Sequence, residues 1–218
     1  MKYKAVLFDM DGTVLDTLGD LAAAVNHTLR EFSMPERSIA EVAAALGNGA
    51  AYLIAHTVPD GTPKELTDKV LAAYAPYYDA QCDILTGPYD GIVPLMEKLR
   101  DRGVKLAVIS NKQDTAVKPL AEKYFPGLLE IAVGESAEVR RKPNPDAVLA
   151  ALRHIGVERG DAIYVGDTEV DLQTARNAGM ECASVDWGFR TREQLVEIGA
   201  EHIFDTVQEL EEYLLKNE

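Results

Sequence analysis

The sequence predicts an α/β protein whose core is a doubly wound parallel sheet and whose first strand is followed by a small all-helical cap domain. Three observations support this prediction. The apolar run Ala5–Phe8 has the length and composition of a buried strand. Residues 16–83 show helical periodicity alone, and strands alternate with helices from Leu85 onward, as in crossover units. We therefore expect a core of residues 1–15 and 84–218 and a cap of residues 16–83.

The cap is expected to be helical throughout. In its first helix, apolar residues recur every three or four positions between Leu18 and Phe32. Turn sequences at residues 47–49 (Gly-Asn-Gly) and 59–61 (Pro-Asp-Gly) separate three further alanine-rich segments. These segments are expected as helices at residues 39–46, 50–58 and 64–78.

The core elements are expected in alternating order along the chain. Strands after the cap are predicted at residues 105–109, 129–133, 162–165, 182–185 and 202–204. Helices are predicted at residues 92–102, 115–124, 146–155, 170–178, 192–198 and 207–215. Doubly wound folds bind ligands outside the carboxyl ends of their strands, so polar residues that directly follow a strand are the candidates for a site.

Composition narrows the classes of function. The 218 residues, 47% of them hydrophobic, are enough to bury a substantial core. A formal net charge of -14 argues against binding of nucleic acid or of an anionic membrane through a basic surface. Cys82 and Cys182 lack metal-type spacing and suit free thiols, and no apolar run has the length of a membrane span. We expect a cytoplasmic monomer or homodimer that acts on a small molecule.

Two carboxylates follow the first strand, in the pentapeptide DMDGT at residues 9–13. Because side chains alternate along a strand, Asp9 and Asp11 point the same way while the extended geometry persists, and Gly12 then lets the chain turn. One carboxylate could attack phosphorus while the other transfers protons, and both could help to hold Mg²⁺. Taken alone, the pentapeptide is also explained as an acidic turn or a helix cap.

Later strand ends supply partners for these carboxylates. Ser110 and Asn111 follow the next core strand and offer a hydroxyl, an amide and backbone donors to phosphoryl oxygens. Lys142, in a proline-rich loop, can offset the charge of a phosphoryl group and of crowded carboxylates. Asp167 would lie at a metal-facing turn, and Asp171 one helical turn further on, close enough to orient Lys142.

Each of these partners also has a purely structural explanation. Ser110 could be a turn residue, Lys142 part of a solvated basic loop, and Asp167 a charge that complements a helix dipole. Acid at one strand end is common, whereas acid, hydroxyl, lysine and acid at four successive elements is hard to obtain by chance. The order of the four segments therefore favours phosphoryl chemistry.

Together, the four segments resemble the motifs of the haloacid dehalogenase superfamily of phosphotransferases, in order and in spacing, over the whole chain. The resemblance implies a Rossmann-like core and a small helical cap of that superfamily's first cap class. It implies that Asp9 is the nucleophile and forms an aspartyl phosphate, that Asp11 is the general acid and base, and that Lys142 stabilises the phosphoryl charge.

The resemblance also implies the ligand-binding residues. The phosphate-binding residues would be Thr13, Ser110, Asn111 and Lys142. The Mg²⁺ ligands would be Asp9, the backbone carbonyl of Asp11, and Asp167, with Asp171 as a supporting carboxylate.

The expected substrate follows from two further features. The presence of Asp11 disfavours the dehalogenase branch, which lacks that acid, so phosphate esters are expected. The cap loop Gly47, Asn48 and Gly49 resembles that of phosphoglycolate phosphatases, as do residues 16–21 and 110–112, although a simple interhelical turn also explains the glycines. The expected reaction is Mg²⁺-dependent hydrolysis of a small phosphorylated metabolite, 2-phosphoglycolate.

Other functions stay open at this point. A sugar phosphomutase similar to beta-phosphoglucomutase shares the core, but Thr13, Leu21 and residues 50–51 depart from that branch. A pyrophosphatase of the same cap class is harder to dismiss. A receiver-like phospho-acceptor module is the non-enzymatic alternative, and the long helical insertion opposes it. A catalytically inactive binding protein is disfavoured because none of the four segments is broken.

Overall fold

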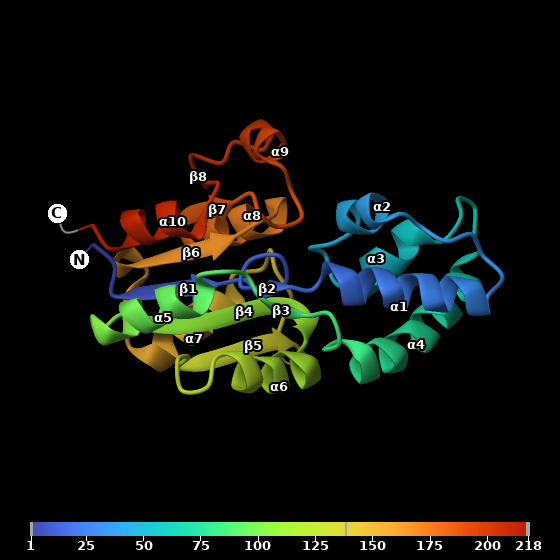
Figure 1. Cartoon of the computed structure of the whole chain (residues 1–218), viewed down its shortest axis with the longest axis horizontal. Helices are drawn as coiled ribbons and strands as arrows, with labels where there is room; N and C mark the ends of the chain where they lie inside the picture. Colours follow the sequence, from blue (N-terminus) through green and yellow to red (C-terminus); the bar gives the residue numbers. More distant parts are fainter. Residues whose placement is uncertain (1, 138, 217–218) are drawn as a thin grey trace.

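The computed structural model of the chain describes residues 2–137 and 139–216. A sheet with helices on both faces forms the core, and a group of helices forms the cap at the other end of the long axis (Figure 1). The chain enters the cap directly after the first strand and its first turn, and returns to the core near residue 87.

In the described part of the chain, the core is built on one six-stranded sheet in which every neighbouring pair is parallel. Its strands are β1 (Ala5–Phe8), β4 (Lys105–Gln113), β5 (Ile131–Glu135), β6 (Ala162–Gly166), β7 (Glu181–Val185) and β8 (His202–Phe204). Their order is β5-β4-β1-β6-β7-β8, so the chain builds outward from β1 in one direction and then in the other. The predicted doubly wound sheet is confirmed, with its switch point beside β1.

Different helices cover the two faces of this sheet, because side chains alternate along each strand. The helices of the core are α5 (Ile92–Asp101), α6 (Asp114–Tyr124), α7 (Asp146–Ile155), the 3₁₀ helix η1 (Arg159–Asp161), α8 (Glu169–Ala178), α9 (Arg192–Glu197) and α10 (Val207–Leu214). Val6 and Phe8 pack in an apolar cluster with α5, α6 and α10. Ala5 and Leu7 pack on the opposite face with α7 and α8.

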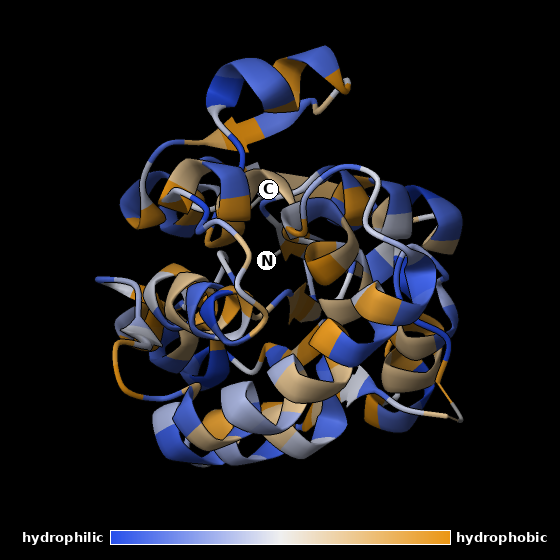
Figure 2. Ribbon diagram, turned by 90° about the vertical axis from the view of Figure 1, so that its right-hand side faces the viewer, coloured by the Kyte–Doolittle hydropathy of each residue, from blue (hydrophilic) through white to orange (hydrophobic). Residues whose placement is uncertain are grey.

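The cap helices pack around an apolar cluster of their own. They are α1 (Leu18–Glu31), α2 (Ile39–Ala44), α3 (Ala50–Thr57) and α4 (Lys64–Gln81). Figure 2 shows the molecule from the cap side, with hydrophobic and hydrophilic residues alternating along these helices. This alternation is expected where one face of each helix is buried. Leu29, Ile54 and Tyr74 are central to the cluster, which also includes Phe189 from the core.

A short ribbon joins the cap to the core. Strands β2 (Leu15–Asp16) and β3 (Gly87–Pro88) pair antiparallel, so the outgoing and returning connections run side by side. The buried carboxylate of Asp20, in α1, accepts hydrogen bonds of 2.9–3.1 Å from three successive backbone N–H groups, those of Ile84, Leu85 and Thr86. The ribbon and this carboxylate therefore hold the outgoing and returning connections together.

Most expected elements agree with the structure to within three residues, and the largest difference is at β4. This strand was expected to end at Ile109 but continues to Gln113, because Gln113 pairs with Glu135 beyond an irregularity in the register. The expected strand 129–133 is β5, displaced to Ile131–Glu135 by the same pairing. Strands β2 and β3 were not predicted, since two-residue strands are too short to show a period. Across the described residues, every helix is too short or too polar to cross a bilayer.

Candidate active site

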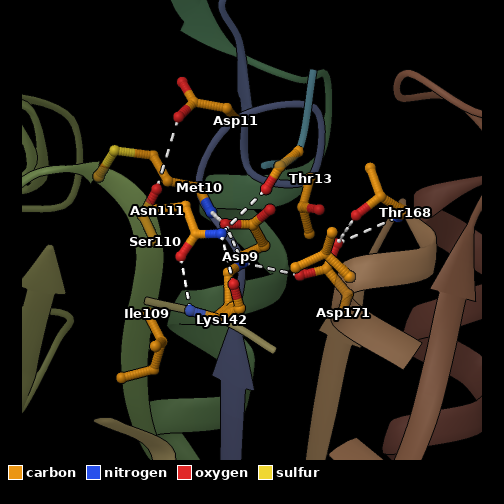
Figure 3. A network of polar contacts seen from close by, with 12 residues as sticks. Asp9, Met10, Asp11, Thr13, Ile109, Ser110, Asn111, Lys142, Thr168 and Asp171 are labelled. Carbon is orange, nitrogen blue, oxygen red and sulfur yellow. Dashed lines mark hydrogen bonds and ion pairs between the residues drawn. The ribbon is translucent and has the colours of Figure 1, made fainter. Parts of the chain in front are cut away.

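The first carboxylate of the site, Asp9, directly follows β1 at the switch point of the sheet. Its backbone N–H donates to Val165 O at 2.8 Å, which continues the pairing with β6 past the end of the strand. Its Oδ1 accepts a hydrogen bond of 2.7 Å from the N–H of Met10, and the residue is buried. The Asp9 carboxylate is thus held in place at the carboxyl end of β1, in the middle of the sheet (Figure 3).

Lys142 joins two of the predicted carboxylates. Its ammonium lies 2.8 Å from Asp9 Oδ1 and donates to Asp171 Oδ1 at 2.7 Å and to the Tyr164 hydroxyl at 3.2 Å. Burial alone would lower the pKa of Lys142, but the carboxylates of Asp171 and Asp9 outweigh burial and hold the pKa well above its usual value. Lys142 is therefore a buried cation, and the alternative of a solvated basic loop is wrong for this residue.

Three buried carboxylates gather beside this cation. Asp9, Asp167 and Asp171 each offer one oxygen, and these oxygens lie within 4.8 Å of one another. Burial, and next the carboxylate of Asp171, raise the pKa of Asp167 to about 7, and the same two causes raise the pKa of Asp9. The cluster carries more negative charge than Lys142 offsets, and such oxygen donors fit a divalent cation of the Mg²⁺ type.

Asp171 is held by hydrogen bonds to both of its carboxylate oxygens. Asp171 Oδ2 accepts hydrogen bonds from the N–H and the hydroxyl of Thr168, at 3.1 and 2.7 Å, in a capping box at the start of α8. With Lys142 on Oδ1, both oxygens of Asp171 are engaged by the protein. Asp171 therefore contacts both Lys142 and the start of α8.

Thr13 contacts the acidic cluster in this structure. Its hydroxyl donates to Asp167 Oδ1 at 2.9 Å, and its carbonyl accepts a hydrogen bond of 3.1 Å from the indole N–H of Trp187. Two glycines let the backbone approach Asp167 this closely. A Cβ on Gly12, where φ is +81°, would lie 2.4 Å from Asp167 Oδ2, and a Cβ on Gly188 would lie 2.3 Å from the same oxygen. Gly188 lies in the segment after β7, and nothing in the sequence around it predicts its close approach to Asp167.

Ser110 and Asn111 lie where β4 passes the site, and they have different partners. The Ser110 hydroxyl lies 3.5 Å from Asp11 Oδ2. The Asn111 side chain accepts from the N–H of Lys142 at 2.7 Å and donates to the carbonyls of Lys142 and Gly47, each at 3.0 Å. In this structure the Asn111 amide therefore fixes the Lys142 loop and contacts the cap.

Lys112 also lies at the site, although its position in the sequence predicts no role for it. The extension of β4 carries it past Ser110 to the carboxylate of Asp11. Its ammonium lies 2.8 Å from Asp11 Oδ1, and its side chain is 5% exposed. Tyr78, from α4 of the cap, contacts the same ammonium through its hydroxyl. In the sequence, Lys112 is simply a lysine that follows a strand, so its position next to Asp11 could not be predicted.

The cap loop of Gly47, Asn48 and Gly49 lies against the core site. Besides the contact of Gly47 with Asn111, the carbonyl of Asn48 accepts a hydrogen bond of 3.3 Å from Arg141. A Cβ on Gly47, where φ is +107°, would lie 3.3 Å from the Thr168 hydroxyl oxygen. The first glycine thus permits a close approach to the core, which a turn between two helices alone does not require.

A cavity separates this loop from the carboxylates. About 80 Å³ of this cavity can hold the centre of a water molecule, and about 700 Å³ is free of protein atoms when the open mouth is included. Asp9, Asp11 and Ser110 line it from the core, and Gly47 and Gly49 line it from the cap. Asp9 and Asp11 therefore face the same space as the two glycines of the cap loop, and Lys142 lies beside it in contact with Asp9.

The comparisons with known proteins agree with this geometry. The chain matches the family model of haloacid dehalogenase-like hydrolases over residues 6–185. It is 32% identical over 213 residues to phosphoglycolate phosphatase 1 of Pseudomonas aeruginosa, covering 95% of this chain and 78% of that protein. It is 33% identical over 223 residues to the phosphoglycolate phosphatase of Rhodospirillum rubrum, covering 97% and 90%.

A solved structure gives the same result for the fold. The crystal structure of a Lactobacillus delbrueckii subsp. bulgaricus protein, provisionally named phosphoglycolate phosphatase, superposes with a TM-score of 0.95. The two chains are 38% identical, and the match covers 100% of each. The resemblance seen in the sequence is therefore confirmed. The chain belongs to the haloacid dehalogenase-like hydrolase family and is a phosphoric monoester hydrolase.

Proposed function

We propose that the chain hydrolyses 2-phosphoglycolate, a small phosphorylated metabolite, through an aspartyl phosphate on Asp9 and with Mg²⁺ as cofactor. The observation that carries this proposal is the meeting of Asp9, Asp11 and Lys142 at one cavity or directly beside it, beneath a glycine-containing cap loop. The names of the relatives from Pseudomonas aeruginosa and Rhodospirillum rubrum support the choice of substrate.

The two aspartates would divide the chemistry between them. The Asp9 carboxylate attacks phosphorus, the bond from phosphorus to the ester oxygen breaks, and Asp11 donates a proton to the departing alcohol. In the second half-reaction, Asp11 takes a proton from the water that attacks the aspartyl phosphate, and inorganic phosphate and free Asp9 result. Lys142, fixed 2.8 Å from Asp9, would stabilise the negative charge on the transferring group.

The acidic cluster supports a metal cofactor. Asp9, Asp167 and the backbone carbonyl of Asp11 would hold Mg²⁺, with Asp171 in support. Burial and the neighbouring Asp171 raise the pKa of Asp167, and a bound cation would oppose both by favouring the charged carboxylate. When bound, Mg²⁺ offsets charge on the phosphoryl oxygens and on the carboxylates. We propose Thr13, Ser110, Asn111 and Lys142 as the phosphate-binding residues.

The cap would act as the lid of this site. We place the boundaries of the cap at residues 16 and 83, beside the β2–β3 ribbon, so that movement about the ribbon opens the cavity for exchange and closes it for chemistry. We also propose a cytoplasmic monomer or homodimer, which the acidic composition and the unpaired Cys82 and Cys182 support.

A kinetic panel tests the proposal. The wild-type protein is assayed for phosphate release from 2-phosphoglycolate, beta-glucose 1-phosphate, pyrophosphate and nucleoside monophosphates, and mutase product is followed separately. We expect the highest kcat/KM for 2-phosphoglycolate. A clear preference for pyrophosphate, or sugar product without phosphate release, would overturn the proposed substrate.

The nucleophile is tested with Asp9→Asn, which keeps the shape of the side chain and removes the attacking charge. We expect turnover to fall by about 10⁴-fold or more, since the covalent step is lost. Acid-quenched mass spectrometry of the wild-type protein during turnover should show a phosphoryl group on Asp9. Normal turnover by Asp9→Asn would show that another group attacks phosphorus.

A further inference from the structure

The cavity beneath the cap has an uneven distribution of charge. Its walls are largely apolar and come mostly from the cap; they include Leu21, Leu46, Leu53, Tyr74 and Phe189. The charged residues of its described lining are Asp9, Asp11, Asp79 and Lys112. Lys112 is therefore the one cation among the described residues that line the space where a leaving group must lie.

Lys112 is held at this wall by both parts of the molecule. Its backbone N–H, at the end of β4, donates to the Ser110 hydroxyl at 3.1 Å. Its ammonium lies 4.6 Å from the centre of the Tyr78 ring and contacts the Tyr78 hydroxyl, so a cap residue positions a cation that the core supplies. The lysine is directed at the cavity by packing as well as by charge.

Lys112 and Asp11 form an ion pair in which the carboxylate oxygen lacks a well-oriented hydrogen bond. The ammonium lies 2.8 Å from Asp11 Oδ1, yet this buried oxygen has no partner with hydrogen-bond geometry among the described residues. The buried Lys112 ammonium has more N–H donors than Tyr78 and Asp11 together can accept. A buried cation in this condition gains from an anion that can accept its remaining hydrogen bonds.

The proposed chemistry brings such an anion to this position. With phosphorus at Asp9 and the ester oxygen at Asp11, the rest of the leaving group lies beyond Asp11, on the side of Lys112. In 2-phosphoglycolate a single methylene separates the ester oxygen from the carboxylate. A cation beside the acid that protonates the ester oxygen is therefore within reach of that carboxylate.

We propose that Lys112 binds the carboxylate of the leaving group, with the Tyr78 hydroxyl orienting the ammonium, and so selects phosphate monoesters of short hydroxy acids. This inference rests on the proposed function and adds a specificity-determining residue to it. Because Tyr78 belongs to α4 of the cap, the carboxylate contact is complete only where the cap meets the core. Esters without a carboxylate lose this contact but keep those of the phosphoryl group.

The test compares two substrates of equal length, 2-phosphoglycolate and ethyl phosphate, which has a methyl group in place of the carboxylate. For each protein the readout is the ratio of kcat/KM for 2-phosphoglycolate to that for ethyl phosphate. In Lys112→Met we expect this ratio to fall by about 100-fold, mainly through KM for 2-phosphoglycolate, and Lys112→Arg should restore part of it. Lys118→Met removes an exposed lysine of α6 and should keep the wild-type ratio.

The outcomes separate this inference from the proposed function. If the wild-type protein prefers 2-phosphoglycolate and Lys112→Met keeps the preference, or loses activity equally on both substrates, Lys112 does not bind the carboxylate and the inference alone fails. If the wild-type protein shows no preference, both the proposed substrate and the inference fail. Should Lys112→Met not fold, Tyr78→Phe serves in its place, because loss of the hydroxyl should lower the same ratio and an unchanged ratio overturns the inference.

Discussion

Lys142 and Asp171 form an ion pair of 2.7 Å in which each side chain is only 1% exposed. The same ammonium lies 2.8 Å from Asp9, so one lysine links the proposed nucleophile to the first turn of α8. Tyr164, buried on β6, completes the contacts of the ammonium and donates its own hydroxyl to the carbonyl of Ile109 on β4. The contacts of the Lys142 ammonium thus connect it to Asp9 at the end of β1 and, through Tyr164, to β6 and β4.

Loss of this cation should affect stability as well as activity. In Lys142→Met, two desolvated carboxylates lose their partner, and we expect the free energy of unfolding to fall by about 3–5 kcal/mol and turnover to be lost. Urea denaturation followed by circular dichroism measures the first effect. The control is Lys118→Met, which removes an exposed pair with Asp114 and should change stability by less than about 1 kcal/mol. Wild-type stability of Lys142→Met would contradict the expected role of the pair.

Gly188 should tolerate no side chain. The Cβ of Gly188→Ala would lie 2.3 Å from Asp167 Oδ2 and equally close to the carbonyl of Gly12, so we expect a loss of about 1–3 kcal/mol of stability and weaker binding of Mg²⁺. Thermal unfolding with and without Mg²⁺ measures both effects. Gly160→Ala is the matched control, because a Cβ there meets nothing within 4 Å. Equal behaviour of the two variants would show that the backbone around Asp167 adjusts freely.

Binding of Mg²⁺ should weaken as the pH falls. Burial and the neighbouring Asp171 raise the pKa of Asp167 to about 7 in the metal-free site, so below this pH a proton must leave before the metal binds. We expect apparent affinity to fall between about pH 8 and about pH 6, by at most about tenfold per pH unit for one displaced proton. Calorimetric titrations in two buffers of different ionisation enthalpy measure affinity and proton release together. An affinity that is independent of pH would exclude Asp167 as a protonated ligand.

The base of the cap should depend on Asp20. Asp20→Asn keeps the size of the side chain but replaces one acceptor oxygen by a donor, which would face the N–H groups of Ile84, Leu85 and Thr86. We expect a loss of about 1–3 kcal/mol of stability and faster proteolysis in the returning connection. Asp60→Asn, at an exposed turn of the cap, is the control. Unchanged proteolysis of Asp20→Asn would mean that the β2–β3 ribbon alone holds the cap in place.

The strands of the six-stranded sheet, their order along the chain and the carboxylates at their ends were predictable from the sequence, because strong apolar runs are followed at once by polar residues. Asp9, Lys142 and Asp171 meet as expected, since parallel strands bring their carboxyl ends to one edge. The family was also predictable from the spacing of these residues. The substrate and the metal stay proposals, and neither is determined by the strand ends alone.

Contacts between segments far apart in the sequence were not predictable. Thr13 donates to Asp167, which lies 154 residues away, and Asn111 of β4 bonds to the backbone of Lys142. Neither contact leaves a period or a local turn signal in the sequence, because each depends on how the loops pack once the sheet has formed. Lys112 was missed for a related reason, since β4 was expected to end at Ile109 and its polar continuation looked like a loop.

Phe189 and Arg190 connect the acidic cluster to the cap within two residues. The N–H of Phe189 donates to Asp167 Oδ2 at 2.7 Å, while its ring packs in the apolar cluster of the cap. Arg190 pairs with Glu169 and donates to the carbonyls of Ala43 and Leu46, each at 3.0 Å. The cap therefore cannot be exchanged as an independent unit. A chimaera that exchanges only residues 16–83 would leave an aromatic ring and a guanidinium matched to the discarded helices, so exchange of the cap must include residues 189 and 190.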